Sequence, residues 1–416
     1  MRQNAHAQAG AITFYPEQAQ AALWNKGLDE VLARLAPHFD HDGPREVAGR
    51  YVRGLLAPVE RKNGWQLAEQ AGYQTPYKLQ HLLGRARWSA ADVRDELRNY
   101  IVEHLGDKAA TLALDETGFL KKGTESVGVQ RQYTGTAGRI ENSQVGVFMA
   151  YVSPKGRALM DRRLYLPKSW ADNPVRRTKA DIPEEIEFAT KPRLARDMVE
   201  AAIEADVPFA WVTGDEVYGN APAFRDWLMT RHISFVLAVP CTMRVCRKGS
   251  ESVEVREVAK YLRKKSWQRL SAGDGTKGER LYDWALVKLR LPETPVYGAW
   301  MLVRRSIQDP TDKAYYVVYG PQDTGLETIV RVAGSRWGVE ECFEAAKGEV
   351  GLDQYEVRLF DGWYRHITLA MFAHAYLVTM RAAALAAEAA VKGGPQSSLP
   401  RGSLTQFKAK RGLSCH

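Results

Sequence analysis

Two aspartates each follow a short apolar run that predicts a buried strand. Asp115 stands in "LALDETGF" and Asp215 stands in "WVTGDEVYG". In α/β sheets ligands bind beyond the carboxyl ends of the strands, so an acid just past a buried strand is poorly placed to be merely solvated. One such aspartate is weak evidence because Asp is common in turns. Two of them, on strands that we expect to be neighbours, predict a pair of carboxylates at one edge of a sheet.

A third acid lies on a predicted amphipathic helix, "SRWGVEECFEAAKGEV". At about 100° per residue, Arg336, Glu340 and Lys347 fall within about 40° of one another around the axis. A solvated face with side-chain pairs is the simpler interpretation. However, Arg336 precedes Glu340, which is the less favourable order for a pair, and Lys347 is about 10 Å further along the axis. If the helix packs beside the two strands, Glu340 brings a third carboxylate to the aspartates.

Three converging carboxylates predict a cation site. Hard oxygen donors repel one another unless a cation lies among them, and Mg²⁺ or Mn²⁺ suits such a set. Two ions about 4 Å apart can activate a water or a 3′ hydroxyl and stabilise the leaving oxygen when a phosphodiester is attacked. Arg336 and Lys347, on the same stripe as Glu340, would then bind substrate phosphates.

Other acids nearby compete for these roles. Glu116 and Glu216 follow the two aspartates, but side-chain alternation along a strand points them elsewhere, so a turn or surface role is expected. Glu341 and Glu344 lie on the same helix as Glu340, about 100° and 40° further round the axis. Neither is flanked by the basic residues in the same register, which favours Glu340.

The pattern along the chain predicts an α/β fold with a β-rich insertion and an N-terminal helical domain, and the order of strands and helices in its core resembles the ribonuclease H fold, so a ribonuclease H-like core is expected. Helical periodicity fills the first segment, strands and helices alternate in the second, short strands with polar turns fill the third, and two helices close the core. The segments are residues 1–105, 106–239, 240–330 and 331–391, followed by a basic tail, 392–416, that we expect to be disordered.

Several basic residues are candidates for DNA contact. The stretch 64–88 reads as two short helices around a turn, which is either a helix-turn-helix or a plain helical hairpin. In the first case Lys78 would face a DNA groove and Arg85 would lie near phosphates. Lys121 and Lys122, after the first aspartate, and Arg131, in a glycine-rich turn, are further candidates for backbone contact; a solvated loop is about equally compatible with the two lysines.

Composition sets the class of protein. The chain has 416 residues, a formal net charge of +9 and a pI near 9.2, which favours a polyanionic partner. Its 4 cysteines follow no metal-ligand spacing and are too sparse for a disulfide scaffold. The first residues lack the apolar stretch of a signal peptide, and no run of about 18 apolar residues is evident. We therefore expect a cytoplasmic protein that does not associate with membranes.

The order Asp, Asp, Glu, with the R-x3-E-x6-K spacing of "RWGVEECFEAAK", resembles the DDE transposases of bacterial insertion sequences. The resemblance extends over about residues 45–385 and includes "DETGFLKKGTESVGVQRQYTGTAGRIENSQVGVFMAYVS", "LYLPKSW" and "GLDQYEVRLFDGWYRHITLAMFAHAYL". It implies that Asp115, Asp215 and Glu340 are a catalytic triad that binds two Mg²⁺, with Mn²⁺ as a substitute. It also implies cut-and-paste transposition on double-stranded DNA, namely terminal inverted repeats and target DNA, by a homodimer on paired ends.

The sequence departs from this pattern at two places. The related branch has a Tyr three residues before the Arg of the signature, and here that position is Ala333. This departure puts a hairpin intermediate in doubt, although a flipped base could still stack on Trp267, Trp284 or Trp300, which as strand residues are more often core. The tail also differs from the family's usual C-terminus. Two alternatives stay open: a nuclease of the same fold without strand transfer, and a DNA-binding protein that no longer cuts.

Overall fold

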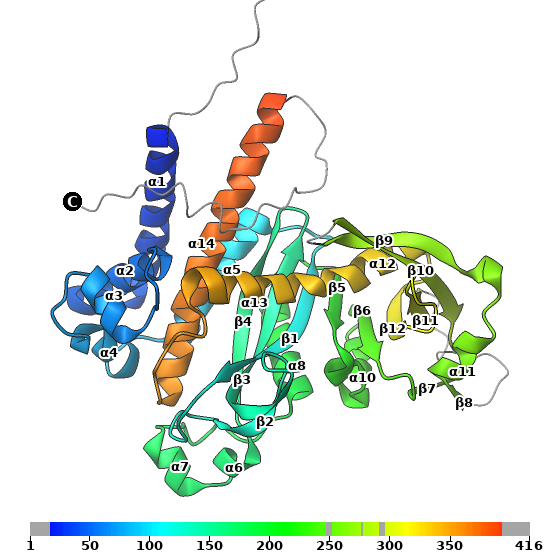
Figure 1. The fold of residues 1–416 in the computed structure, drawn as a ribbon, viewed down its shortest axis with the longest axis horizontal. Helices are drawn as coiled ribbons and strands as arrows, with labels where there is room; N and C mark the ends of the chain where they lie inside the picture. The colour runs from blue at the N-terminus through cyan, green and yellow to red at the C-terminus, as the bar shows by residue number, and fades with distance from the viewer. Residues whose placement is uncertain (1–16, 247–251, 276–277, 291–295, 393–416) are drawn as a thin grey trace, which may run out of the picture.

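The computed structural model describes residues 17–246, 252–275, 278–290 and 296–392. The predicted tail, 392–416, lies almost entirely outside these residues. The described part of the chain begins with a group of helices, coloured from blue to cyan in Figure 1, most of which lie at one end of the molecule. They are α1 (Glu17–Leu35), η1 (Ala36–His38), α2 (Asp42–Leu56), α3 (Gly64–Gln70), α4 (Tyr77–Gly84) and α5 (Ala90–Leu105). Side-chain caps at Asn63 and Ser89 bond the first amides of α3 and α5, which explains where these helices start.

A mixed sheet forms the middle of the molecule. Its core strands are β1 (Thr111–Leu120), β3 (Arg139–Ser153), β4 (Gly156–Tyr165), β5 (Trp211–Gly214) and β6 (Ser234–Val239), with the short β2 (Gln130–Thr134) beside β3. β3 lies antiparallel to both β1 and β4, whereas β1, β5 and β6 are parallel. The order β4–β3–β1–β5–β6 with these directions is that of the ribonuclease H fold. The predicted α/β class with a ribonuclease H-like core is therefore confirmed.

The segment after β6 extends this sheet. It contains β7 (Arg244–Cys246), β8 (Ser252–Glu254), α11 (Val255–Lys260), η2 (Lys264–Ser266), β9 (Gln268–Gly275), β10 (Gly278–Lys288), β11 (Tyr297–Arg305) and β12 (Lys313–Pro321). β12 pairs antiparallel with β6, and β11, β10 and β9 follow outward in that order. The strands between 240 and 330 thus continue the core sheet, while β7 and β8 pair separately. The predicted boundaries at residues 105, 239 and 330 stay predictions.

The remaining helices connect the strands, and several of them pack against the sheet. They are α6 (Lys168–Ala171), α7 (Pro174–Lys179), α8 (Lys191–Glu204), α9 (Glu216–Gly219), α10 (Pro222–Thr230), α12 (Leu326–Ser335), α13 (Trp337–Val350) and α14 (Phe360–Lys392). α13 lies across β1, β3 and β4 and appears as the gold helix in Figure 1. It ends at Gly351, whose positive φ of 66° and close approach to Lys62 suit only glycine.

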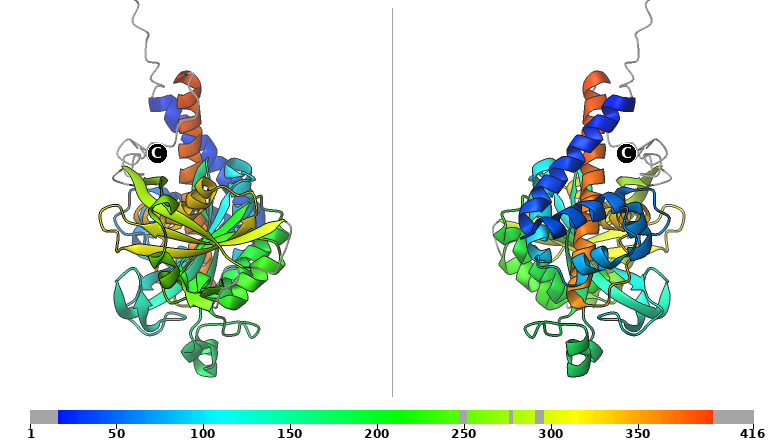
Figure 2. Two further views of the ribbon diagram at one scale, coloured as in Figure 1. Left: turned by 90° about the vertical axis from the view of Figure 1, so that its right-hand side faces the viewer. Right: turned by 90° about the vertical axis from the view of Figure 1, so that its left-hand side faces the viewer.

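One apolar helix, α14, joins the N-terminal helices to the sheet. Its stretch Phe360–Glu388 is long and apolar enough to cross a membrane by length and composition, but 56% of an apolar 18-residue window within it is buried inside the protein. α14 packs against β4, α5, α4, α2 and α1, and its Trp363 and Phe372 are fully buried. These contacts explain its apolar character as that of a core helix. The side views in Figure 2 show α1 and α14 projecting together beyond the sheet.

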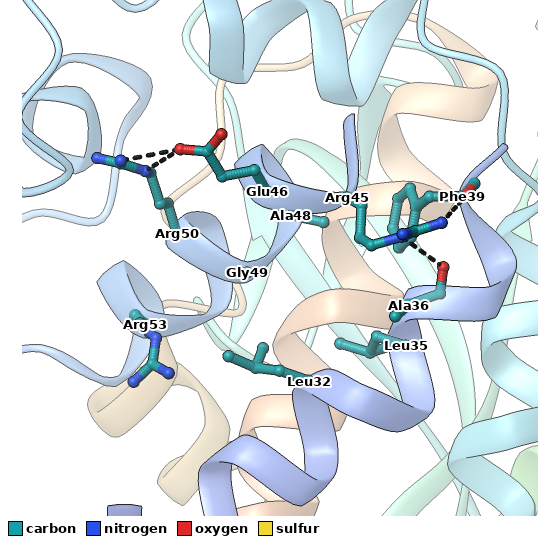
Figure 3. Close-up of a pocket in the computed structure, with 10 residues that line it drawn as sticks. All are labelled: Leu32, Leu35, Ala36, Phe39, Arg45, Glu46, Ala48, Gly49, Arg50 and Arg53. Carbon is teal, nitrogen blue, oxygen red and sulfur yellow. Dashed lines mark hydrogen bonds and ion pairs between the residues drawn. The ribbon is translucent and has the colours of Figure 1, made fainter. Parts of the chain in front are cut away.

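Two hydrophobic clusters hold the described residues together. The larger one runs from the N-terminal helices through α14 to the core strands, so the helical region and the sheet share one core. The smaller one lies between the extending strands and α12, and includes Trp284, Trp300 and Ala333. A cavity of about 340 Å³ between α1 and α2 is lined mainly by apolar and basic side chains. Figure 3 shows that Arg45 at this cavity is bound to backbone oxygens and that Arg50 is paired with Glu46. The side chains that line the cavity therefore do not form a catalytic group.

Candidate active site

The register of β1 and β5 sets the positions of the two aspartates. The strands pair in parallel up to Leu114 and Gly214, so the next residues, Asp115 and Asp215, stand beside each other where β5 ends. Asp215 caps the short helix α9, with its Oδ1 accepting a hydrogen bond from the Val217 amide at 2.9 Å. Asp215 therefore lies directly after the end of a strand, as predicted. The same prediction is wrong for Asp115, which lies in the middle of the longer β1.

Glu116 joins the two aspartates. One carboxylate oxygen from each of Asp115, Glu116 and Asp215 lies within 4.8 Å of the others. Glu116 accepts bonds from Lys191 Nζ on α8 at 2.5 Å and from the Tyr218 hydroxyl at 3.0 Å. The turn or surface role expected for Glu116 from strand alternation is therefore wrong. Since β5 stops at Gly214, that edge of β1 is open, and neighbouring side chains from both faces can turn toward Asp215.

The electrostatics of this group favour an added cation. Burial, and then the nearby Asp215 carboxylate, raise the pKa of Asp115 to about 7, against the opposing effect of Arg336. Burial and then Glu116 raise the pKa of Asp215 to about 6. In both cases burial and a neighbouring carboxylate disfavour the charged form of the aspartate. Three hard oxygen donors whose charge the protein's own bases compensate only in part fit a divalent cation.

Glu340 lies beside this group but outside its closest set. Its carboxylate, 39% exposed, pairs with Arg336 Nη1 at 2.9 Å, and the same nitrogen lies 3.5 Å from Asp115 Oδ2. Asp115 and Glu340 therefore share one guanidinium nitrogen. The stripe predicted for this helix is present, but Arg336 points at carboxylates rather than outward. Burial opposes its charge, and Glu340 and Asp115 reverse this effect, so that the pKa of Arg336 is raised.

Lys347 also points into the protein. Its ammonium donates to the Thr117 hydroxyl at 2.7 Å and the Thr136 hydroxyl at 3.3 Å, and lies 3.5 Å from the Gly118 carbonyl. Thr117 follows Asp115 by two residues and shares its face of β1. Lys347 thus joins α13 to β1 and to the turn between β2 and β3. Burial lowers the pKa of this ammonium.

The remaining candidates for DNA contact differ in exposure. Lys121 donates to the Tyr355 carbonyl at 3.0 Å and lies over the Tyr355 ring, and burial lowers its pKa to about 8. Its ammonium is thus used inside the protein. Lys122, Arg131, Lys78 and Arg85 are exposed. Arg85 lies at the end of α4, and Lys78 lies at its start. The Lys78 ammonium is 4.7 Å from the centre of the Tyr73 ring, which precedes this helix.

The tryptophan candidates for base stacking are mostly core residues. Trp284 is fully buried and donates to the Leu270 carbonyl, and Trp300 is buried in the same cluster. Trp267 is half-buried, with the Arg305 guanidinium 4.0 Å from its ring centre. Among the three, only Trp267 retains an accessible surface.

A ribonuclease H fold with carboxylates gathered where β1 and β5 lie side by side defines a class of metal-dependent enzymes that cut nucleic acid. Residues 34–275 match the family described as "DDE superfamily endonuclease". This match covers more than half of the chain, which therefore belongs to the DDE superfamily endonucleases.

Similar proteins point the same way. A probable transposase for insertion sequence element IS701 from Microchaete diplosiphon is 22% identical over 324 residues, which cover 73% of this chain and 74% of the relative. The prediction of a DDE transposase is confirmed by the family match together with this relative.

Two solved structures are also similar. A piggyBac transposase synaptic complex with hairpin DNA has a TM-score of 0.47 and 10% identity, over 95% of this chain and 79% of that one. The Mos1 strand transfer complex has a TM-score of 0.17 and 13% identity, over 57% and 61%.

Proposed function

We propose that this enzyme cuts DNA at the ends of an insertion sequence and joins the freed 3′ ends to target DNA, by cut-and-paste transposition. The observation that carries the proposal is the approach of Asp115, Glu116 and Asp215 to within 4.8 Å at the edge between β1 and β5. Asp115, Asp215 and Glu340 are the proposed catalytic triad, and Glu116 is an additional carboxylate that the sequence pattern did not assign.

The carboxylates would hold Mg²⁺, with Mn²⁺ as a substitute and two ions per site. Bound there, the ions would supply the charge that activates a nucleophilic oxygen and stabilises a leaving one. The protein's own contribution is to fix the donors: α9 orients Asp215 through the Val217 amide, and Lys191 and Tyr218 orient Glu116. The Glu116 amide bonds Asp115 Oδ1 at 2.8 Å, which orients that carboxylate in turn.

Double-stranded DNA, both the terminal inverted repeats and the target, is the proposed substrate. The net charge of +9 and the exposed bases Lys78, Arg85, Lys122 and Arg131 support phosphate contact. Cutting and joining two ends in one event requires two catalytic sites, which supports a homodimer on paired ends. A cytoplasmic location fits an enzyme that acts on bacterial DNA.

The test is a cleavage assay with the purified chain and DNA that carries the inverted repeats flanking its own gene. We expect Mg²⁺-dependent cuts at both ends, followed by joining of pre-cleaved ends to a target plasmid. Cleavage without joining would favour a nuclease of the same fold, and binding without cleavage would favour a DNA-binding protein that has lost its activity. Asp215→Asn is the matched control because Asn still caps α9.

A further inference from the structure

Arg336 lies where a positive charge between Asp115 and Glu340 is needed. We propose that Arg336 is an internal cation that occupies the metal site before ions bind, and that it must release both carboxylates when a divalent ion is bound. Released in this way, its guanidinium becomes available to a DNA phosphate. The proposal rests on the proposed function, because it takes this site to be the metal site.

The contacts of Arg336 give the first support. A single nitrogen, Nη1, lies 2.9 Å from Glu340 Oε1 and 3.5 Å from Asp115 Oδ2. The side chain is only 19% exposed, so it lies within the site and not on the surface. A guanidinium in this position satisfies the two carboxylates, but it also holds Glu340 apart from the closer group of Asp115, Glu116 and Asp215.

The charges that face the site give the second support. Four carboxylates, those of Asp115, Glu116, Asp215 and Glu340, face the site. Among the described residues, Lys191 and Arg336 form ion pairs with three of them, namely Glu116, Asp115 and Glu340. Lys191 binds Glu116 alone, from α8, whereas Arg336 contacts two of the acids. A divalent ion among the acids would repel the guanidinium at short range, since like charges a few ångströms apart in a partly buried site interact strongly. Arg336 is therefore the cation that competes with the metal.

The position of Arg336 in the chain allows it to move without loss of fold. It stands where α12 meets α13, with helical dihedral angles, and its guanidinium carbon lies 5.2 Å from the centre of the Trp337 ring. That ring offers a contact that does not depend on the carboxylates. In the proposed metal-bound state, a different side-chain rotamer places the guanidinium away from both acids.

The test is calorimetric titration of Mn²⁺ into the full chain without DNA. We expect R336Q to bind Mn²⁺ roughly tenfold more tightly than the wild type, because the competing charge is gone. R331Q is the matched control: Arg331 is exposed on α12, so its loss removes the same charge and should leave the affinity unchanged. Equal or weaker Mn²⁺ binding by R336Q, or equal tightening by R331Q, would overturn the proposal.

A second measurement on the wild type removes any dependence on how the variants fold. In crystals soaked with Mn²⁺, we expect the contact between Arg336 and Asp115 to be broken and the ion to touch both Asp115 and Glu340. An ion bound among the acids with Arg336 still in place would refute the competition while leaving the metal site itself intact. If neither wild type nor R336Q bound Mn²⁺, both the competition and the site assignment would fail.

Discussion

Asp115 and Asp161 are both largely buried carboxylates in one sheet, and their surroundings are opposite. Asp161, on β4, is fully buried, and although burial alone would raise its pKa, Arg163, Arg94 and Arg162 hold that pKa well below the usual range. Asp115, on β1, is 14% exposed and has its pKa raised by burial and by Asp215. A buried acid surrounded by the protein's own bases is part of the framework. A buried acid that lies among other acids is suited to binding a cation from solution.

The cluster at Asp161 joins the N-terminal helices to the core. Arg94 Nη1, from α5, donates to both oxygens of Asp161 at 2.9 and 2.8 Å, and Arg163 donates at 3.1 Å. Arg162 reaches the Ala90 carbonyl at the start of α5. These bonds tie α5 to β4, the edge strand of the core, so the charge of Asp161 serves the assembly of the fold.

The largest effect on stability that we expect comes from Asp161→Ala. It would leave buried arginines without their shared anion, and breaking a buried pair in this way costs about 3–5 kcal/mol. Urea unfolding followed by circular dichroism measures the change. The matched variant Asp115→Asn should leave the free energy of unfolding unchanged or higher, because it relieves repulsion with Asp215. If Asp161→Ala lowered the free energy of unfolding by less than about 1 kcal/mol, Asp161 would not have the structural role that distinguishes it from Asp115.

The next effect is a pH dependence in the protein without divalent ions. Because the pKa values of Asp115 and Asp215 are raised in the folded chain to about 7 and 6, the folded state binds more protons than the unfolded state above pH 4. The free energy of unfolding therefore falls as pH rises from about 4 and levels off above about pH 7. After allowance for solvent screening, we expect a loss on the order of 2 kcal/mol between pH 5 and 8 from this site.

Melting temperatures measured across this pH range test that expectation. The double variant Asp115→Asn, Asp215→Asn should show a flatter profile than the wild type, and Mg²⁺ should restore much of the wild-type stability at pH 8. Parallel profiles for the two proteins would mean that the acids do not repel one another as described.

A smaller effect is expected at Lys347, which resembles the Asp161 region in having its partners inside the protein. Lys347→Met should lower the free energy of unfolding by about 1 kcal/mol, because the bonds to Thr117 and Thr136 are lost. Lys122→Met, at an exposed lysine, should change it by less than about 0.5 kcal/mol. If Lys347→Met melted like the wild type yet cut DNA roughly tenfold more slowly, the phosphate clamp predicted from the sequence would be the better account.

The smallest effect concerns DNA affinity. Lys78→Gln removes one exposed charge from α4, so it should weaken binding to inverted-repeat DNA a few-fold and reduce the slope of log affinity against log salt by about 1. Fluorescence anisotropy over a salt series measures both quantities. Lys260→Gln is the control, since the Lys260 ammonium is already paired with Glu257 at 2.7 Å. An unchanged slope in Lys78→Gln would place the recognition surface elsewhere.

The sequence predicted the elements of the fold well because each signal was local. The apolar run before Asp215 marks β5, and helical periodicity marks α13. The continuation of the sheet through β12 could not be predicted, because a pairing such as that of Val317 with Leu237 depends on contacts between segments far apart in the chain.

The site was predicted only in part for a similar reason. Asp115 and Asp215 stand out because each follows a short apolar run of residues. Glu116 was missed because alternation assumes a covered strand, and nothing in the sequence shows that β5 ends at Gly214 beside it. The inward direction of Arg336 was missed because periodicity places a residue on a stripe without showing what lies opposite that stripe.

The measurement that tests the central claim most directly compares Mn²⁺ binding by the wild type and by Asp215→Asn. Electron paramagnetic resonance at pH 7.5 measures the bound fraction. Asn retains the cap of α9 and removes only the charge, so the fold should be preserved and the melting temperature should be equal to or higher than that of the wild type. If the acids beside β1 and β5 are the metal site, the wild type should bind Mn²⁺ saturably, and Asp215→Asn should lose that binding by at least about tenfold in affinity. Equal Mn²⁺ binding by the two proteins would contradict the assignment of the site.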